Sequence, residues 1–168
     1  AGYDNNLEFT IDCPNNRYIN DEAICQAVVA MWAKIGVKTK LNAMPRATFF
    51  PKVANGDTSI YLFGWGVPTF DAYYTLESLI RSKATGAAGA FNYGGYSNPK
   101  VDALIDAIKT EIDDAKRTAM IQEAFTIHAQ EFGTIPLHDQ VIPWAMKKNV
   151  TMTHNSNDAP KMYYVNVN

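Results

Sequence analysis

The stretch Leu7-Glu8-Phe9-Thr10-Ile11-Asp12-Cys13 alternates apolar and polar residues, which is the period-two pattern of a strand with one buried face. The alternation places Cys13 on the inward side. A similar alternation runs from Val37 to Ala43, and we expect a helix between the two strands, capped by Asp21 and ended by Gly36. The apolar stripe predicted for that helix is Ile24, Val28, Met31, Trp32 and Ile35. These three elements form a β-α-β unit, which indicates the α/β class.

Further strand and helix signals follow this unit. A short helix is predicted from about Thr48 to Ala54, and the continuous apolar run Ile60-Tyr61-Leu62-Phe63 predicts a strand covered on both faces. The glycine-rich stretch from Thr85 to Tyr96 is expected to be a surface loop. Ile135 to Met146 reads as extended chain broken by prolines.

Two helices are expected in the second half of the chain. One begins at Asn98-Pro99 and is expected to pack on the sheet, and the other is capped by Asp113 or Asp114 and closes near Gly133. Their predicted apolar faces are Val101, Leu104, Ile105, Ile108 and Ile112 in the first, and Ile121, Ala124, Phe125, His128 and Phe132 in the second. With no linker-like or repeated segment, residues 1–168 are expected to form a single domain with helices packed on a mixed sheet.

Composition excludes some partners and leaves others open. Hydrophobic residues make up 47% of the chain, which is enough for a packed core. Fifteen basic and seventeen acidic residues give a net charge of -2 without a basic run, which argues against a nucleic-acid partner. No apolar run approaches the roughly 20 residues needed to cross a bilayer.

The best candidate binding segment comes directly after the third predicted strand. In open α/β sheets ligands collect at the carboxyl ends of strands, and this segment begins Gly64-Trp65-Gly66-Val67 and ends at Phe70 and Asp71. Glycine lets the backbone approach a ligand closely, and Trp65 and Phe70 offer rigid apolar surface. We therefore expect Trp65, Gly66, Val67 and Phe70 to contact a ligand. An equally weighted alternative is that these aromatics cover the end of the sheet or a partner lobe.

Three polar residues extend this candidate site. Arg46 follows the second predicted strand and could hold a ligand carboxylate, although a solvated arginine at a helix start is the commoner reading. Asp71 could pair with an ammonium group or cap the helix that begins at Ala72, and the cap is slightly favoured. His138 shares one side of an extended stretch with Gln140 and could touch a ligand, with pairing inside the fold as the default.

An enzymatic reading needs a nucleophile and a base held together. Its candidates, Cys13, Cys25, His128, His138 and Asp139, form no known signature, and a core position is favoured for His128. The two cysteines fit neither a zinc site nor a closely spaced redox pair, and they could form one disulfide. A small thiol- or histidine-dependent hydrolase stays the alternative to a binding protein, and a surface that docks another protein is a third reading. The sequence indicates no cofactor and no metal.

Four segments, taken in order, resemble one known family. They are Ala1-Gly2-Tyr3, Met31-Trp32-Ala33-Lys34-Ile35-Gly36-Val37, Phe63-Gly64-Trp65-Gly66, and the run from Tyr96-Ser97-Asn98-Pro99 to Ile105. This series is similar to the family 5 extracellular solute-binding proteins, the dipeptide and oligopeptide receptors of ABC importers. The resemblance covers nearly the whole chain.

The resemblance implies a non-enzymatic protein outside the cytoplasm, periplasmic or otherwise extracytoplasmic and membrane-associated. Family members are longer proteins of two lobes that enclose a peptide or other small solute and deliver it to membrane permease subunits. The chain corresponds to the C-terminal lobe, so its implied partners are the solute, the N-terminal lobe and the permease. In peptide-binding members an aspartate soon after the Gly-Trp pair holds the ligand ammonium, whereas here Val67-Pro68 occupies that place and Asp71 comes later.

Overall fold

The computed structural model describes residues 7–153 and 159–168. Ala1-Gly2-Tyr3, which entered the family resemblance, lies outside the described residues. None of the described helices is long and apolar enough to cross a membrane. The elements, in chain order, are β1 (Glu8–Pro14), α1 (Asp21–Ala33), β2 (Lys38–Met44), α2 (Arg46–Ala54), β3 (Ile60–Tyr61), α3 (Ala72–Thr75), the π-helical turn η1 (Leu76–Ile80), α4 (Pro99–Ile108), α5 (Asp114–Gln130), β4 (Val150–Met152), the 3-10 turn η2 (Met162–Tyr164) and β5 (Val165–Val167).

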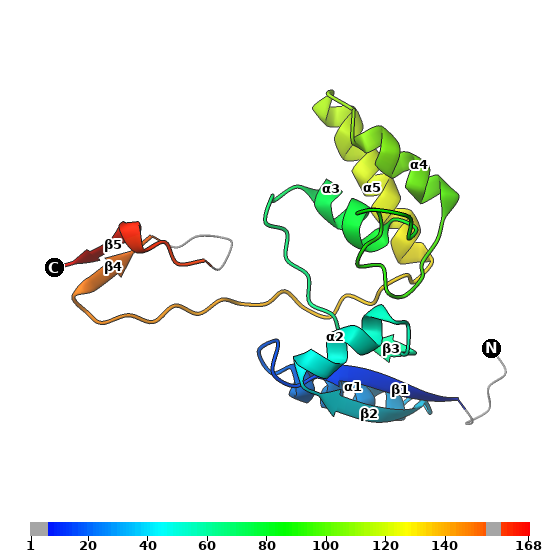
Figure 1. Cartoon of the computed structure of the whole chain (residues 1–168), viewed down its shortest axis with the longest axis horizontal. Helices are drawn as coiled ribbons and strands as arrows, with labels where there is room; N and C mark the ends of the chain where they lie inside the picture. The colour runs from blue at the N-terminus through cyan, green and yellow to red at the C-terminus, as the bar shows by residue number, and fades with distance from the viewer. Residues whose placement is uncertain (1–6, 154–158) are drawn as a thin grey trace.

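The first part of the chain forms a three-stranded sheet in the order β2-β1-β3 (Figure 1). Both neighbours of β1 run parallel to it, with Cys13 opposite Ala43 and Ile11 opposite Ile60. This confirms the α/β class and the β-α-β unit. The sheet was expected to be mixed and is parallel throughout, and antiparallel pairing occurs in the separate β4–β5 hairpin.

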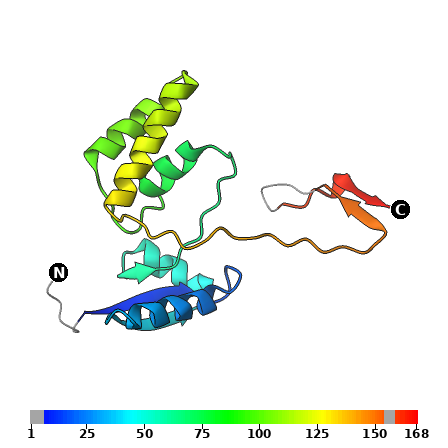
Figure 2. The ribbon, with the colours of Figure 1, turned by 180° about the vertical axis from the view of Figure 1, so that it is seen from behind.

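Helix α1 covers one face of the sheet, behind it in Figure 1 and in front of it in Figure 2. Ile11 and Cys13 point to α1, where they pack with Cys25 and Val28. Asp12 points to the opposite face, where its carboxylate pairs with Lys52 of α2 at 2.8 Å. The side chains of β1 therefore alternate, as the sequence pattern predicted, between the face covered by α1 and the face that carries α2.

The predicted stripe of α1 was partly wrong. Val28 is buried as expected, but Met31 is 54% exposed and Ile35 is 75% exposed. Trp32 also faces the sheet as expected, and Cys25 and Val29 face it in addition. The disulfide between Cys13 and Cys25 fixes this rotation, because it ties one flank of the helix to the carboxyl end of β1.

The strand predicted at residues 60–63 is shorter and less covered than expected. Only Ile60 and Tyr61 pair with β1, and residues 60–63 are half-buried. The described residues place no further strand beyond β3, so its outer edge and part of its surface stay open.

The helices of the second half form a core of their own, above the sheet in Figure 1. Helix α4 was expected to pack on the sheet, and it packs instead on η1 and α5. Ile112 and Phe132, predicted on apolar faces, are 95% and 82% exposed because both lie just past a helix end. The buried members of this core are Leu76, Ile80, Val101, Ile105, Ile108 and Ala124.

After α5 the chain leaves both cores. Residues 134–147 run as extended chain away from them, and the β4–β5 hairpin lies at the far end (Figure 1, Figure 2). The extended reading of residues 135–146 is confirmed. Several apolar side chains of this segment are exposed: Ile135, Leu137, Val141, Ile142 and Met146.

Candidate functional site at the carboxyl edge of the sheet

Three parallel strands end at the same edge of the sheet, so the residues that follow them are brought together. After β1 comes the loop 15–20, after β2 comes Arg46, and after β3 come Gly64 and Trp65. The β2-β1-β3 order sends the first connection to one side of β1 and the next to the other side. Loops diverge at such a switch point, which is where ligands bind in open α/β sheets.

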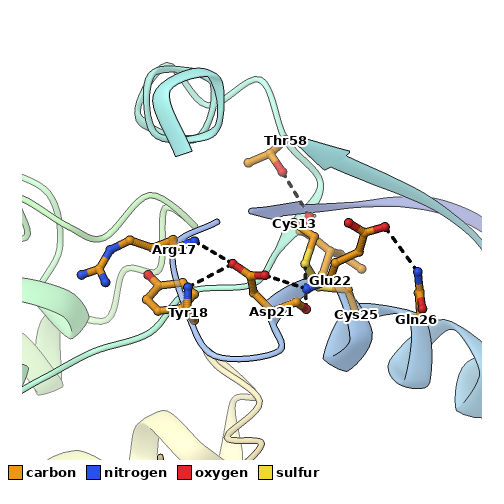
Figure 3. The surroundings of a disulfide bond; sticks show 9 residues. Cys13, Arg17, Tyr18, Asp21, Glu22, Cys25, Gln26 and Thr58 are labelled. Carbon is orange, nitrogen blue, oxygen red and sulfur yellow. Dashed lines mark hydrogen bonds between the residues drawn. A yellow bond between two sulfur atoms is a disulfide. The ribbon is translucent and has the colours of Figure 1, made fainter. Parts of the chain in front are cut away.

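The loop after β1 is held in shape by the buried carboxylate of Asp21. Its oxygens accept hydrogen bonds from the backbone N–H groups of Arg17 at 2.9 Å, Tyr18 at 3.0 Å and Glu22 at 2.9 Å (Figure 3). Burial by itself would raise the pKa of Asp21, but these three bonds favour the charged form and leave the pKa below its ordinary value. The prediction that Asp21 is the N-cap of α1 was wrong. The N-cap position belongs to Asn20, which has a positive φ and no side-chain cap bond.

Tyr18 joins the first loop to the end of β3. Its hydroxyl donates to the carbonyl oxygen of Gly64 at 3.4 Å, and a Cβ added at Gly64 would lie 2.6 Å from the Tyr18 ring. The guanidinium of Arg17 lies 4.8 Å from the centre of the same ring. A glycine is therefore needed at position 64 for the ring to lie against the strand end.

Arg46 lies beside the same loop, as its place after β2 predicted. Its backbone N–H donates to the side-chain oxygen of Asn16 at 2.8 Å, and its side chain is exposed. Within the described residues its guanidinium makes no ion pair.

Trp65 is half-buried in a cluster of aromatic rings. It stacks on Phe63 with ring centres 6.2 Å apart and on Tyr74 at 5.3 Å, and meets Phe91 edge-on at 5.2 Å. Its indole N–H donates to the Thr75 hydroxyl at 3.1 Å. Much of the Trp65 ring therefore packs between the sheet and the helical core. This is the structural role that the sequence left open as the alternative to ligand contact.

The turn that follows presents an exposed aromatic ring. The N–H of Phe70 donates to the carbonyl of Val67 at 3.0 Å, and Phe70 has φ 55° and is 65% exposed. A bulky residue in the left-handed region is strained, and such strain is concentrated at binding sites. Gly66 is exposed, and no atom lies within 4 Å of the position that a Cβ would take there, so there is open space beside it.

Asp71 caps α3 and pairs with α5. One carboxylate oxygen accepts from the N–H of Tyr73 at 2.8 Å, and both oxygens lie 2.9 Å from the same guanidinium nitrogen of Arg117. The Arg117 hydrogen bonds lower the pKa of Asp71 and outweigh the desolvation. The cap prediction is confirmed, and the carboxylate is already paired. It borders a hollow of about 360 Å³ lined by Thr69, Asp71, Tyr73, Tyr74, Glu77 and Ser78.

A second hollow, of about 370 Å³, lies on the α2 face of the sheet. At its base Asp12, 1% exposed, accepts from Asn42 at 2.6 Å and from Lys52 at 2.8 Å. Lys52 also contacts the carbonyl oxygen of Asp57. These groups satisfy one another, so the cluster works as a buried structural ion pair.

The structure thus gathers Arg46, Trp65 and Gly66 at one edge, and Phe70 and Asp71 follow in the adjoining turn. His138 is not among them, since it is exposed on the extended segment and makes no hydrogen bond or ion pair with a described residue. Sequence reasoning missed Tyr18 and Arg17. Their signal was a polar loop directly after the first predicted strand, where ligand contacts are expected.

Three of the five residues weighed for catalysis are engaged in structure, whereas His138 and Asp139 are exposed on the extended segment. Cys13 and Cys25 form a disulfide, as predicted to be possible, so neither offers a thiolate. His128 is 5% exposed, and its Nε2 lies 3.1 Å from the Thr134 hydroxyl. This confirms the predicted core histidine. The described residues contain no group of three or more side chains suited to hold a metal ion.

Comparisons with known proteins agree on one family. Residues 1–87, just over half of the chain, match the family described as Bacterial extracellular solute-binding proteins, family 5 Middle. The glutathione-binding protein GsiB of Shigella dysenteriae is 30% identical over 157 residues, which cover 90% of this chain and 30% of GsiB. The chain therefore spans about a third of the length of such curated relatives.

Two solved structures share the fold over 99% of the chain. The periplasmic binding protein DppA of Helicobacter pylori, in complex with peptide STSA, has a TM-score of 0.79 and 20% identity, with 32% of DppA covered. HbpA2 of Haemophilus parasuis has a TM-score of 0.75 and 24% identity, with 33% covered. At these identities the likeness concerns the fold.

Proposed function

The chain belongs to the family 5 bacterial extracellular solute-binding proteins, and from that membership we propose that it supplies one side of the solute-binding cleft of an ABC importer receptor. Proteins of this family bind solutes and are not enzymes. The cleft would hold a peptide or a related small compound and pass it to the permease subunits in the membrane. A thiol-dependent hydrolase is incompatible with the disulfide between Cys13 and Cys25.

The observation that carries this proposal is the make-up of the carboxyl edge. It combines the Tyr18 ring, the exposed Gly66, the half-buried Trp65 and the exposed Arg46, and among residues 7–153 and 159–168 it brings no nucleophile beside a base. Rigid rings with a few polar groups suit recognition of a small molecule. We assign Trp65, Gly66, Val67, Phe70 and Arg46 to ligand contact and add Tyr18 and Arg17 to them.

Two relatives support a peptide-like ligand. GsiB is named for binding glutathione, and the DppA structure contains the peptide STSA. We propose His138 as a weaker candidate, because it would reach the ligand only if the extended segment folded back to the edge.

We propose further that residues 1–168 form the C-terminal lobe of a two-lobed receptor. The chain covers 30% of GsiB, and the N-terminal lobe would then close the cleft from the other side. The disulfide favours a compartment outside the cytoplasm, such as the periplasm. Because one lobe supplies only part of the enclosing surface, we expect the 168 residues alone to bind their solute weakly.

The test is native mass spectrometry of the full-length two-lobed receptor after export to the periplasm and gentle purification. We expect a retained, chemically unaltered small molecule, and its occupancy should fall in Tyr18→Ala. Tyr163→Ala is the matched control, because Tyr163 is 72% exposed on η2, far from the β2-β1-β3 sheet (Figure 1). A covalent adduct or a cleaved product would contradict the proposal, and so would equal occupancy in both variants.

A further inference from the structure

His128 lies at the point where the extended segment leaves the helical core (Figure 1). It is 5% exposed in the last turn of α5, and its Nε2 lies 3.1 Å from the hydroxyl of Thr134, the first residue of the segment. The turn between them is tight, because Phe132 has φ 54° and the N–H of Gly133 donates to the His128 carbonyl at 3.2 Å. A Cβ at Gly133 would collide with the imidazole. The ring therefore packs directly against the start of the extended segment.

The buried imidazole has a hydrogen-bond partner for one of its two nitrogens. Nε2 has the Thr134 hydroxyl, whereas the buried Nδ1 has no partner among the residues that the structure describes. A neutral imidazole carries one proton, and with that proton on Nε2 the bare Nδ1 needs no acceptor. An imidazolium donates from both nitrogens, so protonation would leave a charged N–H buried at Nδ1 without an acceptor. The ring therefore fits this position only in its neutral form.

The titratable groups packed against His128 are engaged elsewhere. The Tyr96 ring meets the imidazole edge-on with centres 4.6 Å apart, and its hydroxyl donates to the Glu131 carboxylate at 2.6 Å. Asn98 donates to the same carboxylate at 2.8 Å. Burial and Glu131 raise the pKa of Tyr96, and the two hydrogen bonds lower the pKa of Glu131, so neither changes its charge between about pH 5 and pH 8. His128 is the member of this cluster that titrates in that range.

The direction of the pH effect follows from the burial of the ring. Burial lowers the pKa of the packed imidazole, and the attraction of Glu131 opposes this only in part, whereas an imidazole released to solvent has the ordinary value of 6.5. The packed arrangement is therefore fully favoured above pH 6.5, and it becomes less favoured as the pH falls below that value.

We propose that the contact between His128 and Thr134 is a pH switch at the base of the extended segment. While the imidazole is neutral, the turn 131–134 stays packed on the helical core. When a proton from solvent binds the imidazole, the ring leaves its position and the turn opens, while the core stays folded. The direction of the extended segment and the position of the β4–β5 hairpin then vary. None of these groups belongs to the candidate site, so the inference goes beyond the proposed function and does not rest on it.

The experiment is amide hydrogen exchange of the ¹⁵N-labelled chain, followed by NMR at pH 7.5 and pH 5.5. The reporters are the amides that are hydrogen-bonded across the turn, those of Glu131, Phe132 and Gly133. We expect their protection factors, which correct for the intrinsic effect of pH on exchange, to fall about tenfold. One power of ten is the most that the open state gains for each pH unit below the pKa of the free imidazole.

A urea series at each pH separates opening of the turn from unfolding of the whole chain. Opening of the turn exposes little surface, so exchange of its amides should not respond to low urea. Exchange of the core residues Ile105 and Ile108 should accelerate with urea, because these side chains are completely buried in the helical core. Turn amides that follow urea in the same way as the core amides would overturn the proposal.

Variants assign the pH dependence to one ring. His128→Gln keeps a side-chain amide that can reach Thr134 and cannot take up a proton, so the turn should lose its pH dependence. Thr134→Val should lower the protection about fivefold at both pH values and keep the pH dependence. The matched control is the double variant His138→Gln/His154→Gln, which removes the other two histidines of the chain and should behave as the parent.

The opposite results are equally definite. Protection that is the same at both pH values in the parent would show that no switch exists, and a pH dependence that persists in His128→Gln would assign it to another group. If His128→Gln does not fold, the parent decides the matter through the NMR signal of the His128 ring. That signal should titrate below pH 6.5 together with the protection of the turn, and a ring that titrates at 6.5 or above contradicts the proposal.

Discussion

His128 is a titratable side chain whose surroundings favour its uncharged form. Its ring meets Tyr96 edge-on with centres 4.6 Å apart, and a Cβ added at Gly133 would lie 2.2 Å from it. Burial lowers the pKa of the imidazole below 6.5, and the Glu131 carboxylate opposes this only in part. A proton taken up by the folded protein must therefore enter a site that disfavours it.

This arrangement predicts a loss of stability in mild acid. The unfolded imidazole takes up a proton as pH falls through 6.5, while the folded one resists it, so the contribution is complete above pH 6.5 and is lost below. Carboxylates such as Asp12, Asp21 and Asp71 keep their charge in that window, because their pKa values are lowered from 3.8. Urea unfolding at pH 7 and at pH 5.5 should show the drop, and His128→Gln should flatten it. An unchanged pH dependence in the variant would assign the effect elsewhere.

The disulfide also acts at the scale of single residues. Cys13 is 0% exposed and Cys25 is 1% exposed, and the bond closes a loop over a sequence separation of 12. Closing a loop of this size restricts the unfolded chain and stabilises the fold by about 3 kcal/mol.

We expect the double variant Cys13→Ala/Cys25→Ala to lose about 3 kcal/mol of unfolding free energy, measured in urea. Dithiothreitol should lower the stability of the parent by a similar amount and leave the variant unchanged. A parent whose stability does not respond to dithiothreitol, with its thiols shown to be free, would contradict the assigned role.

At the scale of elements, the carboxylates of Asp71 and Glu131 make contacts that link the helices of the second half of the chain. Asp71 is the N-cap of α3, and its carboxylate also pairs with Arg117 in α5. One side chain therefore caps one helix and links it to another. Glu131 plays a similar part near the end of α5, where it accepts from the Tyr96 hydroxyl at 2.6 Å and from Asn98 at 2.8 Å. The Glu131 hydrogen bond and burial raise the pKa of Tyr96, so that phenol stays protonated in ordinary buffers.

The two roles of Asp71 can be separated by substitution. Asp71→Ser keeps a side-chain cap and loses the ion pair, and Asp71→Ala loses both. We expect Asp71→Ala to cost about 1 kcal/mol more than Asp71→Ser, and Asp71→Ser to cost under about 1 kcal/mol, because the pair is partly exposed. Equal losses in thermal or urea unfolding would show that the cap contributes nothing.

Local patterns predicted the elements well and their packing partners less well. The strand of residues 8–14, its parallel neighbour and the caps Asn98 and Asp113 follow from alternation and side-chain chemistry, which act over a few residues. The rotation of α1 follows only in part, since Val28 and Trp32 face the sheet as predicted but Met31 does not, and the disulfide brings Cys25 to the sheet instead. The same holds for α4, whose apolar face fits a sheet or a helix equally.

The sequence likewise predicted only some of the residues of the candidate site. Arg46, Trp65 and Gly66 could be placed at the edge because the position after a strand is readable from sequence. The position of Tyr18 after the first strand was readable in the same way, but its contact with Gly64 was not, because that contact spans 46 residues. The pairing of Asp71 with Arg117 also spans 46 residues, so sequence patterns could not predict that the Asp71 carboxylate is already paired.

At the scale of the whole molecule, the chain has two packed regions and one long exposed segment (Figure 1). Aromatic rings around Trp65 join the sheet to the helical core, whereas residues 134–149 make few contacts with either. Exposed apolar residues on extended chain are readily attacked by proteases, because the backbone enters the protease without unfolding.

Limited proteolysis should therefore cut the extended segment first. We expect thermolysin to cleave next to Ile135, Leu137 or Val141 and to leave a resistant piece that contains residues 8–133, identified by intact-mass spectrometry. The glycine-rich stretch 85–96 is the internal comparison, since Gly89 and Asn92 anchor it by burial and hydrogen bonds. Earlier cleavage in that stretch would show that the extended segment is covered in solution.

The β1-α1-β2 unit and its disulfide have a consequence for the order in which the chain folds during biogenesis. β1, α1, β2 and the disulfide all lie within residues 8–44, so the whole unit is contained in one short stretch of the chain, and its longest contacts, between β1 and β2, span 30 residues. Contacts of low sequence separation form quickly. If the chain is exported as proposed, we therefore expect the disulfide to form while later residues are still being translocated, so that the remaining chain folds against an already formed unit.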